Sequence, residues 1–513
     1  MKATWIGRLA GGITGVIAGG AALGVAELFA AFTGGAQASP VIAVGSAGIT
    51  LTPEWLKEFA IRHFGTNDKL VLLISLGTAV GVLAVVIGIV ARRHLTVGLA
   101  GFGAFGVLGA LAAVTRPTGG WTAVIPSIAG GLAGMAALAL LVHAMTRASL
   151  AERVEEPQGA DRRNLLLVGA GAVVVGGASG LGGNLLLGRK NVNAARKAVR
   201  LPGPASRAKA VPAGAQIRVP GMTPFVTPNP DFYRVDTALT LPQVSPHDWM
   251  LRIHGMVDHP VELSFDDLLK QPMLERDITL SCVSNQVGGR YAGNARWLGA
   301  SLPALLRQAG VRSGADQVLS RSTDGFTIST PIETIMDGRD SLLAVGMNGE
   351  ALPVAHGFPA RMIVPGLYGY VSATKWVVDL KVTRFSTDAA YWTKRGYSEQ
   401  APIKTLSRID VPRSFAQVKA GRVPVAGTAW AQHRGIDVVE VRVDGGPWRR
   451  TQLAPVPGTD TWRQWVLEWD ATPGSHRLEV RATDGTGAVQ PQKRVPVIPD
   501  GATGWHSVAV TVT

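Results

Sequence analysis

The stretch “TLSCVSNQVGG”, from Thr279 to Gly289, contains the only cysteine of this 513-residue chain. The residues before the cysteine have the apolar character of a strand, and those after it are typical of a loop. Functional sites are often built where strands end. Cys282 is thus compatible with three roles: a small buried residue, a nucleophile, or a thiolate ligand of a metal whose other ligands come from a cofactor. A single cysteine excludes an intramolecular disulfide and any all-cysteine zinc or iron–sulfur site.

Short strand-like runs broken by turns surround this stretch, without a regular strand–helix–strand rhythm. Two segments carry helix signals: “SFDDLLKQ” has Ser264 as N-cap, and “SLPALLRQAG” has Ser301 as N-cap and Gly310 as a stop. The pattern predicts an α+β domain over residues 219–405. Helix signals then disappear, and alternating apolar and polar runs joined by Asp-Gly turns predict an all-β, immunoglobulin-like sandwich over 406–513.

The first part of the chain differs in composition. Of all residues 47% are hydrophobic and only 17% are charged, and before about residue 190 the apolar residues form long blocks. Five blocks are long enough to cross a hydrocarbon core of about 30 Å as helices. They predict a membrane domain over 1–188, followed by a basic linker rich in Ala and Pro over 189–218. The blocks are Leu9–Phe32, Leu70–Ala91, Leu95–Val114, Trp121–Met145 and Leu165–Leu187.

Basic residues next to these blocks predict the orientation of the membrane domain. Arg92 and Arg93 lie in one short connection, and Arg162 and Arg163 lie in another. Placing both connections in the cytoplasm satisfies the positive-inside rule and puts the chain after the fifth block outside the cytoplasm. The pair Arg162 and Arg163 also resembles a twin-arginine export signal, although ordinary anchoring is the commoner reason for such a pair. The basic run over 189–200 lies on the wrong side for this rule.

Ionisable residues within the blocks are few: Glu27 and His143, with His94 at an edge. A bis-histidine haem needs two facing histidines at one depth, and such a pair is not evident, so we expect these helices to pack and to anchor. The formal charge of +14 comes without Arg/Lys runs interleaved with aromatic residues, so we expect no nucleic-acid partner. Membrane-flanking residues and an anionic ligand explain the charge better.

Two glycine-bearing loops carry groups that suit a phosphate or pyrophosphate. “HGFPARMIVPG” pairs His356 with Arg361, and “GYVSATKW” adds Ser372, Thr374 and Lys375. Cationic and hydroxyl side chains in such loops bind phosphate oxygens, while solvated loop charge is the alternative for either segment. Neither segment is a P-loop or a GxGxxG motif, so neither indicates a nucleotide by itself.

Three arginines lie beside aromatic residues: Arg234 in “DFYRVD”, Arg296 in “GNARW” and Arg463 in “WRQW”. Such arginines often stack on rings at structural positions, whereas several converging on one cavity would bind an oxyanion. Tyr397, in “YWTKRGY”, is by itself of a kind that usually packs.

Taken together and in this order, these segments resemble the membrane-anchored bacterial members of the sulfite oxidase family of molybdopterin-dependent oxidoreductases, from about Pro228 to the C-terminus. “MNGEALPVAHGFPARMIVPG” is the closest stretch. “DFYRVD” resembles the Phe-x-Arg segment that contacts the pterin, and “TLSCVSN” stands where the family has its molybdenum-binding cysteine. “WTKRGY” resembles the segment with the active-site tyrosine, and “VAGTAWAQHRGIDVVEVRVDGGPW” resembles the dimerisation domain. “SATKW” matches only after a shift of one residue.

The resemblance implies a cofactor, molybdenum with molybdopterin (Mo-molybdopterin), and a role for each matched residue. Cys282 would bind the metal, and Cys282, Tyr397 and Arg234 would be catalytic. Arg234, Arg296 and Arg463 would bind a small anionic substrate. The residues that would contact the cofactor are Phe232, Tyr233, Arg234, Asp324, His356, Arg361, Ser372, Thr374 and Lys375.

Two departures from the family pattern predict that the substrate side of the pocket differs from that of a sulfite oxidase. Cys282 is followed by Val-Ser-Asn where the family commonly has Ala-Gly-Asn, and Arg234 is followed by Val where the family has Asn. A cytochrome b5-like haem domain is not recognisable either. We therefore expect a separate electron-transfer partner, such as a c-type cytochrome or a membrane carrier.

These expectations combine into a multi-domain protein of the cell membrane. Transmembrane α-helices precede an α+β molybdopterin domain of the sulfite oxidase type on the extracytoplasmic side, and an immunoglobulin-like domain follows, through which a homodimer would form. The expected function is oxidation of sulfite or a similar small oxyanion by oxygen-atom transfer. The alternatives are a reductase of sulfoxides or related oxides on the same scaffold, and a cofactor-free membrane-anchored binding module.

Overall fold

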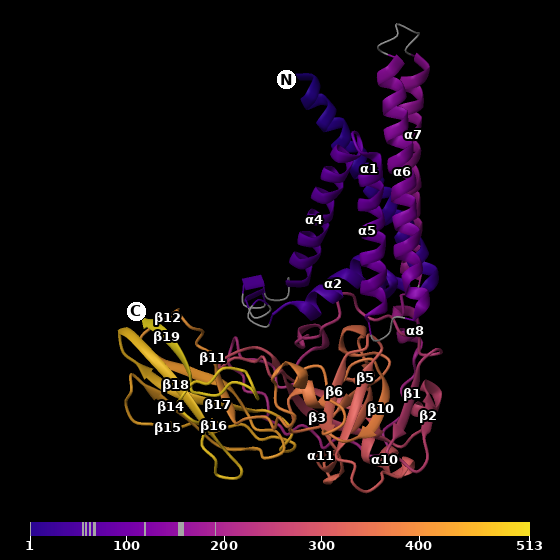
Figure 1. Ribbon diagram of the computed structural model, residues 1–513. Coiled ribbons are helices and arrows are strands. Elements are labelled where there is room, and N and C mark those ends of the chain that lie inside the picture. The colour runs from indigo at the N-terminus through magenta and orange to yellow at the C-terminus, as the bar shows by residue number, and fades with distance from the viewer. Residues whose placement is uncertain are drawn as a thin grey trace. The chain divides into compact units, whose positions relative to one another are not determined.

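The computed structural model describes residues 2–53, 56, 59–60, 63–64, 68–116, 120–151, 159–189 and 191–513. The chain forms two compact units. The helical unit comprises Met1–Asn191 together with Thr237–Gln243, and the sheet unit comprises Val192–Asp236 together with Val244–Thr513. Long helices make up the first unit, and sheets with short helices make up the second (Figure 1).

The helical unit contains five described helices that are long and apolar enough to cross a membrane, as the sequence predicts. Glycines let these helices approach closely: a Cβ on Gly15 of α1 would run into the backbone of Ala84 of α4, and Gly24 of α1 lies equally close to Gly176 of α7. The elements are α1 (Lys2–Thr33), η1 (Gly35–Ala38), α2 (Pro40–Leu51), α4 (Asp68–Ala91), α5 (Leu95–Val114), η3 (Trp121–Val124), α6 (Ile125–Ala151) and α7 (Gly159–Arg189).

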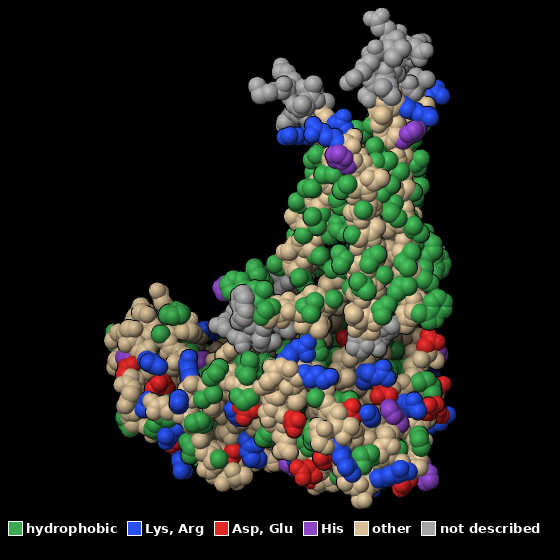
Figure 2. Space-filling model, in the orientation of Figure 1, with side chains coloured by type: hydrophobic (Ala, Val, Ile, Leu, Met, Phe, Trp, Pro, Cys, Tyr) green, Lys and Arg blue, Asp and Glu red, His purple; other side chains and the backbone are tan. Residues whose placement is uncertain are grey.

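Basic side chains gather at one end of these helices, and apolar side chains cover their length (Figure 2). Arg92 and Arg93 follow the end of α4, and Arg163 lies in the first turns of α7. The side chain of Arg92 packs against Gly7 and Gly11 near the start of α1. Of the basic residues discussed above, Lys190 and the side chains of Arg162 and Arg189 lie outside the described residues.

The opposite ends of the helices hold the segment Thr237–Gln243. The side-chain amide of Gln37 donates to the carbonyl and the hydroxyl oxygens of Thr240 at 3.3 and 3.1 Å. Lys69 at the start of α4 donates to the carbonyl oxygen of Ala238 at 2.8 Å. Within α1, Glu27 accepts a hydrogen bond from Ser39, which agrees with a structural role for this acid.

The first part of the sheet unit has two mixed or antiparallel sheets with short helices at their edges. One sheet has the order β2-β1-β10-β5-β6, and the other has the order β3-β4-β7-β8 with β9 paired to β7. The strands are β1 (Met250–Gly255), β2 (Val261–Ser264), β3 (Met273–Ser281), β4 (Ala292–Ser301), β5 (Gln317–Ser322), β6 (Thr327–Pro331), β7 (Leu342–Met347), β8 (Glu350–Ala351), β9 (Arg361–Ile363) and β10 (Val377–Thr383).

The predicted helix caps of this part are confirmed. Ser264 accepts a hydrogen bond from the amide of Asp267 and forms a capping box, and Ser301 accepts one from Ala304. Gly310 ends its helix at a φ of 71°, in the left-handed region that favours glycine. The helices are α8 (Asn193–Ala198), η4 (Asn229–Asp231), α9 (Phe265–Leu269), α10 (Leu302–Ala309), α11 (Ile332–Met336), η5 (Val354–His356), α12 (Gly369–Ser372) and η6 (Thr393–Arg395).

Most of the predicted linker 189–218 belongs to the sheet unit, from Val192 onward, and part of it pairs with β3. The amide of Ala205 donates to the carbonyl oxygen of Met273, and the amide of Glu275 donates to that of Ser206, both at 2.8 Å. These bonds extend the sheet at its β3 edge, because the unpaired backbone groups of an edge strand can pair with an extended segment that runs alongside.

The C-terminal part consists of two sheets that share one hydrophobic core. Their orders are β11-β13-β17-β16 and β12-β19-β18-β14-β15. Buried residues of both sheets meet in this core, and Trp430 and Trp462 belong instead to the core of the first part, so the two parts pack together. The strands are β11 (Leu406–Val411), β12 (Ala416–Val418), β13 (Gly421–Trp430), β14 (Ile436–Val443), β15 (Arg449–Arg450), β16 (Gln452–Leu453), β17 (Arg463–Ala471), β18 (Gly474–Asp484) and β19 (His506–Val512).

Replacement of Asp484 by asparagine is expected to destabilise the sheet unit. Its buried carboxylate accepts hydrogen bonds from Thr405 at 2.6 Å, Thr486 at 2.7 Å and Arg434 at 2.9 Å. Burial alone would raise the pKa of Asp484, but these hydrogen bonds outweigh it and hold the pKa well below its usual value. Because the amide cannot accept them all, we expect the unfolding free energy to fall by about 1–3 kcal/mol.

The pH dependence of this effect follows from the lowered pKa. The carboxylate stabilises the fold above the pKa of the unfolded chain, about 3.9, and this stabilisation is lost as the pH falls toward the folded value. Thermal unfolding of the full chain in detergent should therefore show a difference between Asp484→Asn and wild type at pH 7 that narrows toward pH 3. The exposed Asp470 offers the control Asp470→Asn, for which no shift is expected. Equal melting temperatures for both variants at pH 7 would contradict the prediction.

Candidate active site

The cysteine loop, Cys282–Tyr291, joins β3 to β4. The two strands pair as far as Ser281 and Ala292, so Cys282 is the first residue beyond the ladder, at a strand end as predicted. The amide of Cys282 donates to the carbonyl oxygen of Tyr291 at 2.8 Å, and the amide of Tyr291 donates to Oδ1 of Asn285 at 2.8 Å. The loop is thus closed on itself, which fixes the direction of the cysteine side chain.

The thiol of Cys282 is buried, with 9% of the residue exposed. Burial raises the pKa of the thiol, while hydrogen bonds from Ser284 and the positive charge of Lys375 act in the opposite direction. The described residues contain no group of three or more His, Cys, Asp or Glu side chains that could hold a metal ion. A metal at Cys282 would therefore need its other ligands from a cofactor.

The C-terminal sheets hold the cysteine loop from outside. Arg408 of β11 donates to the carbonyl oxygen of Gly289 at 2.7 Å, and the ring of His506 of β19 occupies the place where a Cβ of Gly288 would lie. Three hydrogen bonds also join Thr279 of β3 to the C-terminal part. The position of the cysteine therefore depends on residues more than a hundred positions away.

Arg361, the first residue of β9, is a buried cation without a carboxylate partner in the described part of the chain. Only 6% of the residue is exposed, and burial lowers its pKa to about 10. One guanidinium nitrogen donates to the carbonyl oxygen of His356 at 3.1 Å, and the guanidinium lies 5.2 Å from the ring centroid of Trp297. Its Nε has no hydrogen-bond partner. A buried guanidinium in this state is suited to an anionic ligand, because an unpaired buried charge is costly.

His356, at the end of η5, is buried and neutral. Burial, together with the charge of Arg361, lowers its pKa to about 4. Its Nε2 lies 3.1 Å from the carbonyl oxygen of Asn229. Because a carbonyl only accepts, Nε2 carries the proton and Nδ1 remains as an acceptor.

Lys375, which follows α12, forms a buried ion pair with Asp236, with 2.8 Å between Nζ and Oδ2. Burial lowers the pKa of Lys375 to about 8, although Asp236 acts in the opposite direction. Arg234 pairs with the same carboxylate oxygen at 2.7 Å, and 37% of its side chain is exposed. Its charge acts on both His356 and Lys375, so these groups lie in one site.

Aromatic rings pack around the cationic groups of this site. Phe232 stacks on Tyr233 with 5.2 Å between ring centroids, and its ring lies edge-on to Trp297 and His356. Burial raises the pKa of the Tyr233 hydroxyl, and the charge of Cys282 adds to this effect. Tyr233 therefore lies near both the cysteine and Arg361, and it stays protonated.

Ser372 and Thr374 lie in the same segment as Lys375, but their hydroxyl groups are bonded within the protein. Ser372 donates to the carbonyl oxygens of the preceding turn at 3.0 and 3.1 Å, and Thr374 shares a 2.5 Å hydrogen bond with Ser320. Both residues are fully buried. Asp324 accepts a hydrogen bond from the amide of Phe326 in the β5–β6 turn. Ser372 and Thr374 thus help to shape the loops around Lys375, and Asp324 helps to shape the β5–β6 turn.

Arg296 and Arg463 direct their guanidinium groups to other partners. Arg296 forms a two-point contact with Asp277 at 2.7 and 2.9 Å, and the positive pKa shift of Arg296 comes first from these hydrogen bonds. Arg463 donates to two backbone carbonyl oxygens of the C-terminal sheets, both at 2.8 Å. Neighbouring side chains of a strand face opposite sides, and here Trp297, next to Arg296, is the one that reaches Arg361.

Tyr397 is 7% exposed, and its ring packs against Tyr370 and Trp392 with centroids 5.4 and 5.1 Å apart. Sequence reasoning missed Tyr368, which lies close enough to Cys282 for their charges to interact. It also missed Asp236, whose partner Lys375 is 139 positions away. Asp236 closes the stretch “DFYRVD” and Tyr368 directly precedes “GYVSATKW”, so the motifs indicated the right segments, but only the fold shows that these two side chains belong to the site.

The group of residues around Cys282 fits a phosphorylated cofactor that carries a soft metal. A buried thiol supplies one soft ligand, and Arg234, Arg361 and Lys375 supply three cationic groups, which we call the cationic cradle. The unpartnered Nε of Arg361 is the observation that favours an anion most directly. These donors match a molybdopterin phosphate together with a metal at the thiolate.

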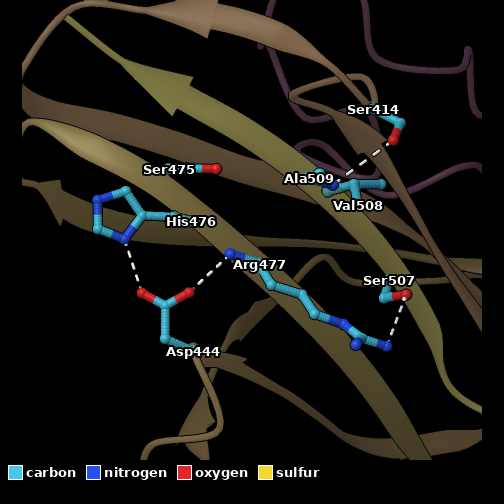
Figure 3. Close-up of a pocket in the computed structure, with 8 residues that line it drawn as sticks. All are labelled: Ser414, Asp444, Ser475, His476, Arg477, Ser507, Val508 and Ala509. Atoms are coloured by element: carbon cyan, nitrogen blue, oxygen red, sulfur yellow. Dashed lines mark hydrogen bonds and ion pairs between the residues drawn. The ribbon is translucent and has the colours of Figure 1, made fainter.

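A separate hollow of about 430 Å³ lies on the C-terminal sheets (Figure 3). In it, Asp444 accepts hydrogen bonds from His476 at 2.7 Å and from the amide of Arg477 at 2.7 Å. These polar groups satisfy one another, and the hollow contains none of the residues of the cysteine site.

The comparisons with known proteins agree with a molybdopterin cofactor. Residues 238–392 match the family described as “Oxidoreductase molybdopterin binding domain”. Mitochondrial sulfite oxidase of Mus musculus is 30% identical over 344 residues, which cover 56% of this chain and 62% of that protein. The oxidoreductase YuiH of Bacillus subtilis is 34% identical over 149 residues, covering 29% of this chain and 72% of that protein.

A crystal structure of the sulfane dehydrogenase SoxCD from Paracoccus pantotrophus superposes with a TM-score of 0.49 at 25% identity, covering 56% of this chain and 84% of that one. The chain spans about three-fifths of the length of the mammalian sulfite oxidases that it matches. The range of the family match, 238–392, includes Cys282, His356, Arg361 and Lys375. The chain therefore belongs to the sulfite oxidase family of oxidoreductases, whose cofactor is Mo-molybdopterin.

Proposed function

We propose that this protein is a membrane-anchored oxidoreductase that oxidises sulfite or a similar small oxyanion, with molybdenum bound by Cys282 and molybdopterin. The observation that carries the proposal is the buried Arg361, whose Nε has no partner among the described residues. It lies in one electrostatic network with Cys282, Tyr233 and Lys375. Because the chain belongs to a family that binds Mo-molybdopterin, we do not propose the cofactor-free binding module considered above.

The residues of the site would divide the work of binding. When bound, Mo-molybdopterin supplies oxygen-atom and two-electron transfer. Arg361, Lys375 and Arg234 would hold the cofactor phosphate, and His356 would accept a hydrogen bond at Nδ1. Arg234, which is partly exposed at the edge of the site, would also attract and orient the anionic substrate. Oxidation of sulfite to sulfate takes one oxygen from water and releases two protons to the solvent and two electrons, which a separate electron-transfer partner must accept.

We also propose the membrane arrangement that the sequence predicts. The basic ends of the helices would face the cytoplasm, because Arg92, Arg93 and Arg163 lie at the same ends. The sheet unit would then lie on the extracytoplasmic side, exported by way of Arg162 and Arg163. An electron carrier in the membrane or a c-type cytochrome would be the partner. The C-terminal sheets would form an immunoglobulin-like domain that pairs two copies of the chain.

A substrate comparison tests the function. The full chain, purified in detergent with its molybdenum content measured, is mixed with sulfite and an oxidised redox dye, and separately with a sulfoxide and a reduced dye. We expect saturable dye reduction with sulfite. Activity on the sulfoxide alone would replace the proposal with the reductase alternative. Loaded protein that is inactive in both directions would refute both reactions.

Arg234→Gln is expected to lower kcat/KM for sulfite about tenfold to a hundredfold, mainly through KM. The reason is that one charge-assisted hydrogen bond contributes about 1.5–3 kcal/mol. Steady-state kinetics measures the change. Arg463→Gln is the matched control, because its guanidinium bonds only carbonyl oxygens of the C-terminal sheets, and we expect kcat/KM within about threefold of wild type. A larger effect of Arg463→Gln than of Arg234→Gln would contradict the assignment of Arg234 to the substrate.

A further inference from the structure

Asp236 occupies an unusual place in the cysteine site: it is a buried carboxylate among groups that would bind an anion. Its side chain is 5% exposed. Oδ2 pairs with Nζ of Lys375 at 2.8 Å and with Nε of Arg234 at 2.7 Å, and Oδ1 lies 3.3 Å from the NH2 nitrogen of Arg234. Neither Arg361 nor His356 forms an ion pair with any described residue, so Asp236 is the carboxylate that serves this group.

The charges of the site determine what Asp236 does to an incoming anion. The cationic cradle contributes three positive charges, His356 is neutral at neutral pH, and Asp236 contributes one negative charge. The cradle together with Asp236 therefore carries a net charge of about +2, which matches a phosphate monoester with a charge of about −1.5 to −2 at pH 7. Without Asp236 the same cations would repel one another in a site where little water is present to screen them.

The hydrogen bonds leave enough donors for a ligand. Asp236 uses one of the three ammonium protons of Lys375 and two of the five guanidinium protons of Arg234. On Arg361, only one guanidinium nitrogen is bonded, to the carbonyl oxygen of His356. An anion can thus bind all three cations while Asp236 stays in place. If Asp236 only took the place of the ligand, its hydrogen bonds would use all the donors that the ligand needs, and they do not.

We propose that Asp236 is a positioning residue of the cofactor site, which orients Lys375 and Arg234 toward the cofactor phosphate and matches the charge of the cradle to it. The inference rests on the cofactor placement proposed above. It predicts that removal of this negative charge weakens the binding of an anion. The net charge of the site alone would predict the opposite, because a more positive site attracts an anion more strongly.

The test measures binding of inorganic phosphate to the full chain produced in a host that makes no molybdopterin, by isothermal titration calorimetry in detergent. We expect Asp236→Asn to bind phosphate about tenfold more weakly than wild type and Asp236→Glu to recover most of the affinity. The matched control is Asp231→Asn, whose carboxylate is exposed and five residues away, and we expect no change. Equal or tighter binding by Asp236→Asn overturns the proposal.

A second measurement separates this proposal from the proposed function. In a host that makes the cofactor, we expect Asp236→Asn to retain about a tenth of the wild-type molybdenum and pterin after dialysis. If wild type itself holds neither, the proposed function fails. If both proteins hold them equally, only the role of Asp236 fails.

A fallback keeps the test decisive if Asp236→Asn does not fold. Asp236→Asn/Lys375→Gln leaves no unpaired buried lysine, and it is compared with Lys375→Gln alone. The double variant should bind phosphate more weakly, because Arg234 has lost its partner as well. Equal affinities would overturn the proposal.

Discussion

Cys282→Ser is expected to leave the protein folded and free of molybdenum, with activity at background. Serine is close in size to cysteine, so the buried site should accept it at a small cost in stability. A serine hydroxyl is a hard, weakly acidic group, whereas a thiolate is the soft ligand that a metal–dithiolene centre suits. No group of three described His, Cys, Asp or Glu side chains is available as a substitute site. Elemental analysis should show molybdenum below about a tenth of the wild-type content.

The pterin content of Cys282→Ser helps to distinguish among the packing, nucleophilic and metal-binding roles that the sequence left open for Cys282. Arg361 and Lys375 remain in place in Cys282→Ser, so some pterin should be retained, as measured by fluorescence after oxidation and release. Ser281→Ala is the matched control, because the hydroxyl of Ser281 is buried and has no hydrogen-bond partner among the described residues. We expect full molybdenum content in that variant. Equal molybdenum in Cys282→Ser and wild type would remove the ligand assignment and return the cysteine to a packing or nucleophilic role.

The sequence predicts well those parts of the fold that depend on local pattern. The long apolar blocks become helices of membrane-spanning length, and the caps at Ser264 and Ser301 form as expected, since capping involves neighbours only. The position of Cys282 at a strand end is likewise local. These features are readable because each depends on residues within a few positions of one another.

Which side chains point into the site could not be predicted from local pattern. Arg296 and Trp297 are adjacent, and which of them turns toward Arg361 depends on the register between β3 and β4, since a shift of one residue reverses every side chain. The same holds for the hydroxyl groups of Ser372 and Thr374, which bond inside the protein. The pairing of Asp236 with Lys375 depends on the tertiary fold alone.

The contacts between the C-terminal sheets and the cysteine loop could not be predicted from local pattern either. They make Gly288 sensitive to substitution. Gly288 has a φ of 78°, which disfavours a residue with a Cβ, and that Cβ would fall on the ring of His506. The ring has little freedom to move, because its Nδ1 accepts a hydrogen bond from the amide of Ile409 at 3.0 Å. Burial, with the charge of Arg408, lowers the pKa of His506 to about 4, so the ring stays neutral and keeps this bond at neutral pH.

Gly288→Ala should therefore displace the cysteine loop and cost most of the activity. A misplacement of about 1 Å at a reacting centre can lower the rate about a hundredfold, and we expect a loss of that size together with reduced molybdenum content. Gly445→Ala is the matched control: its φ is 72°, but nothing lies within 4 Å of the added Cβ. It bears the same backbone penalty of about 1 kcal/mol without the collision, so its molybdenum content should be normal. Adding His506→Ala to Gly288→Ala should restore part of the activity by making room for the methyl group. If Gly288→Ala were as active as Gly445→Ala, the C-terminal sheets would not determine where Cys282 lies.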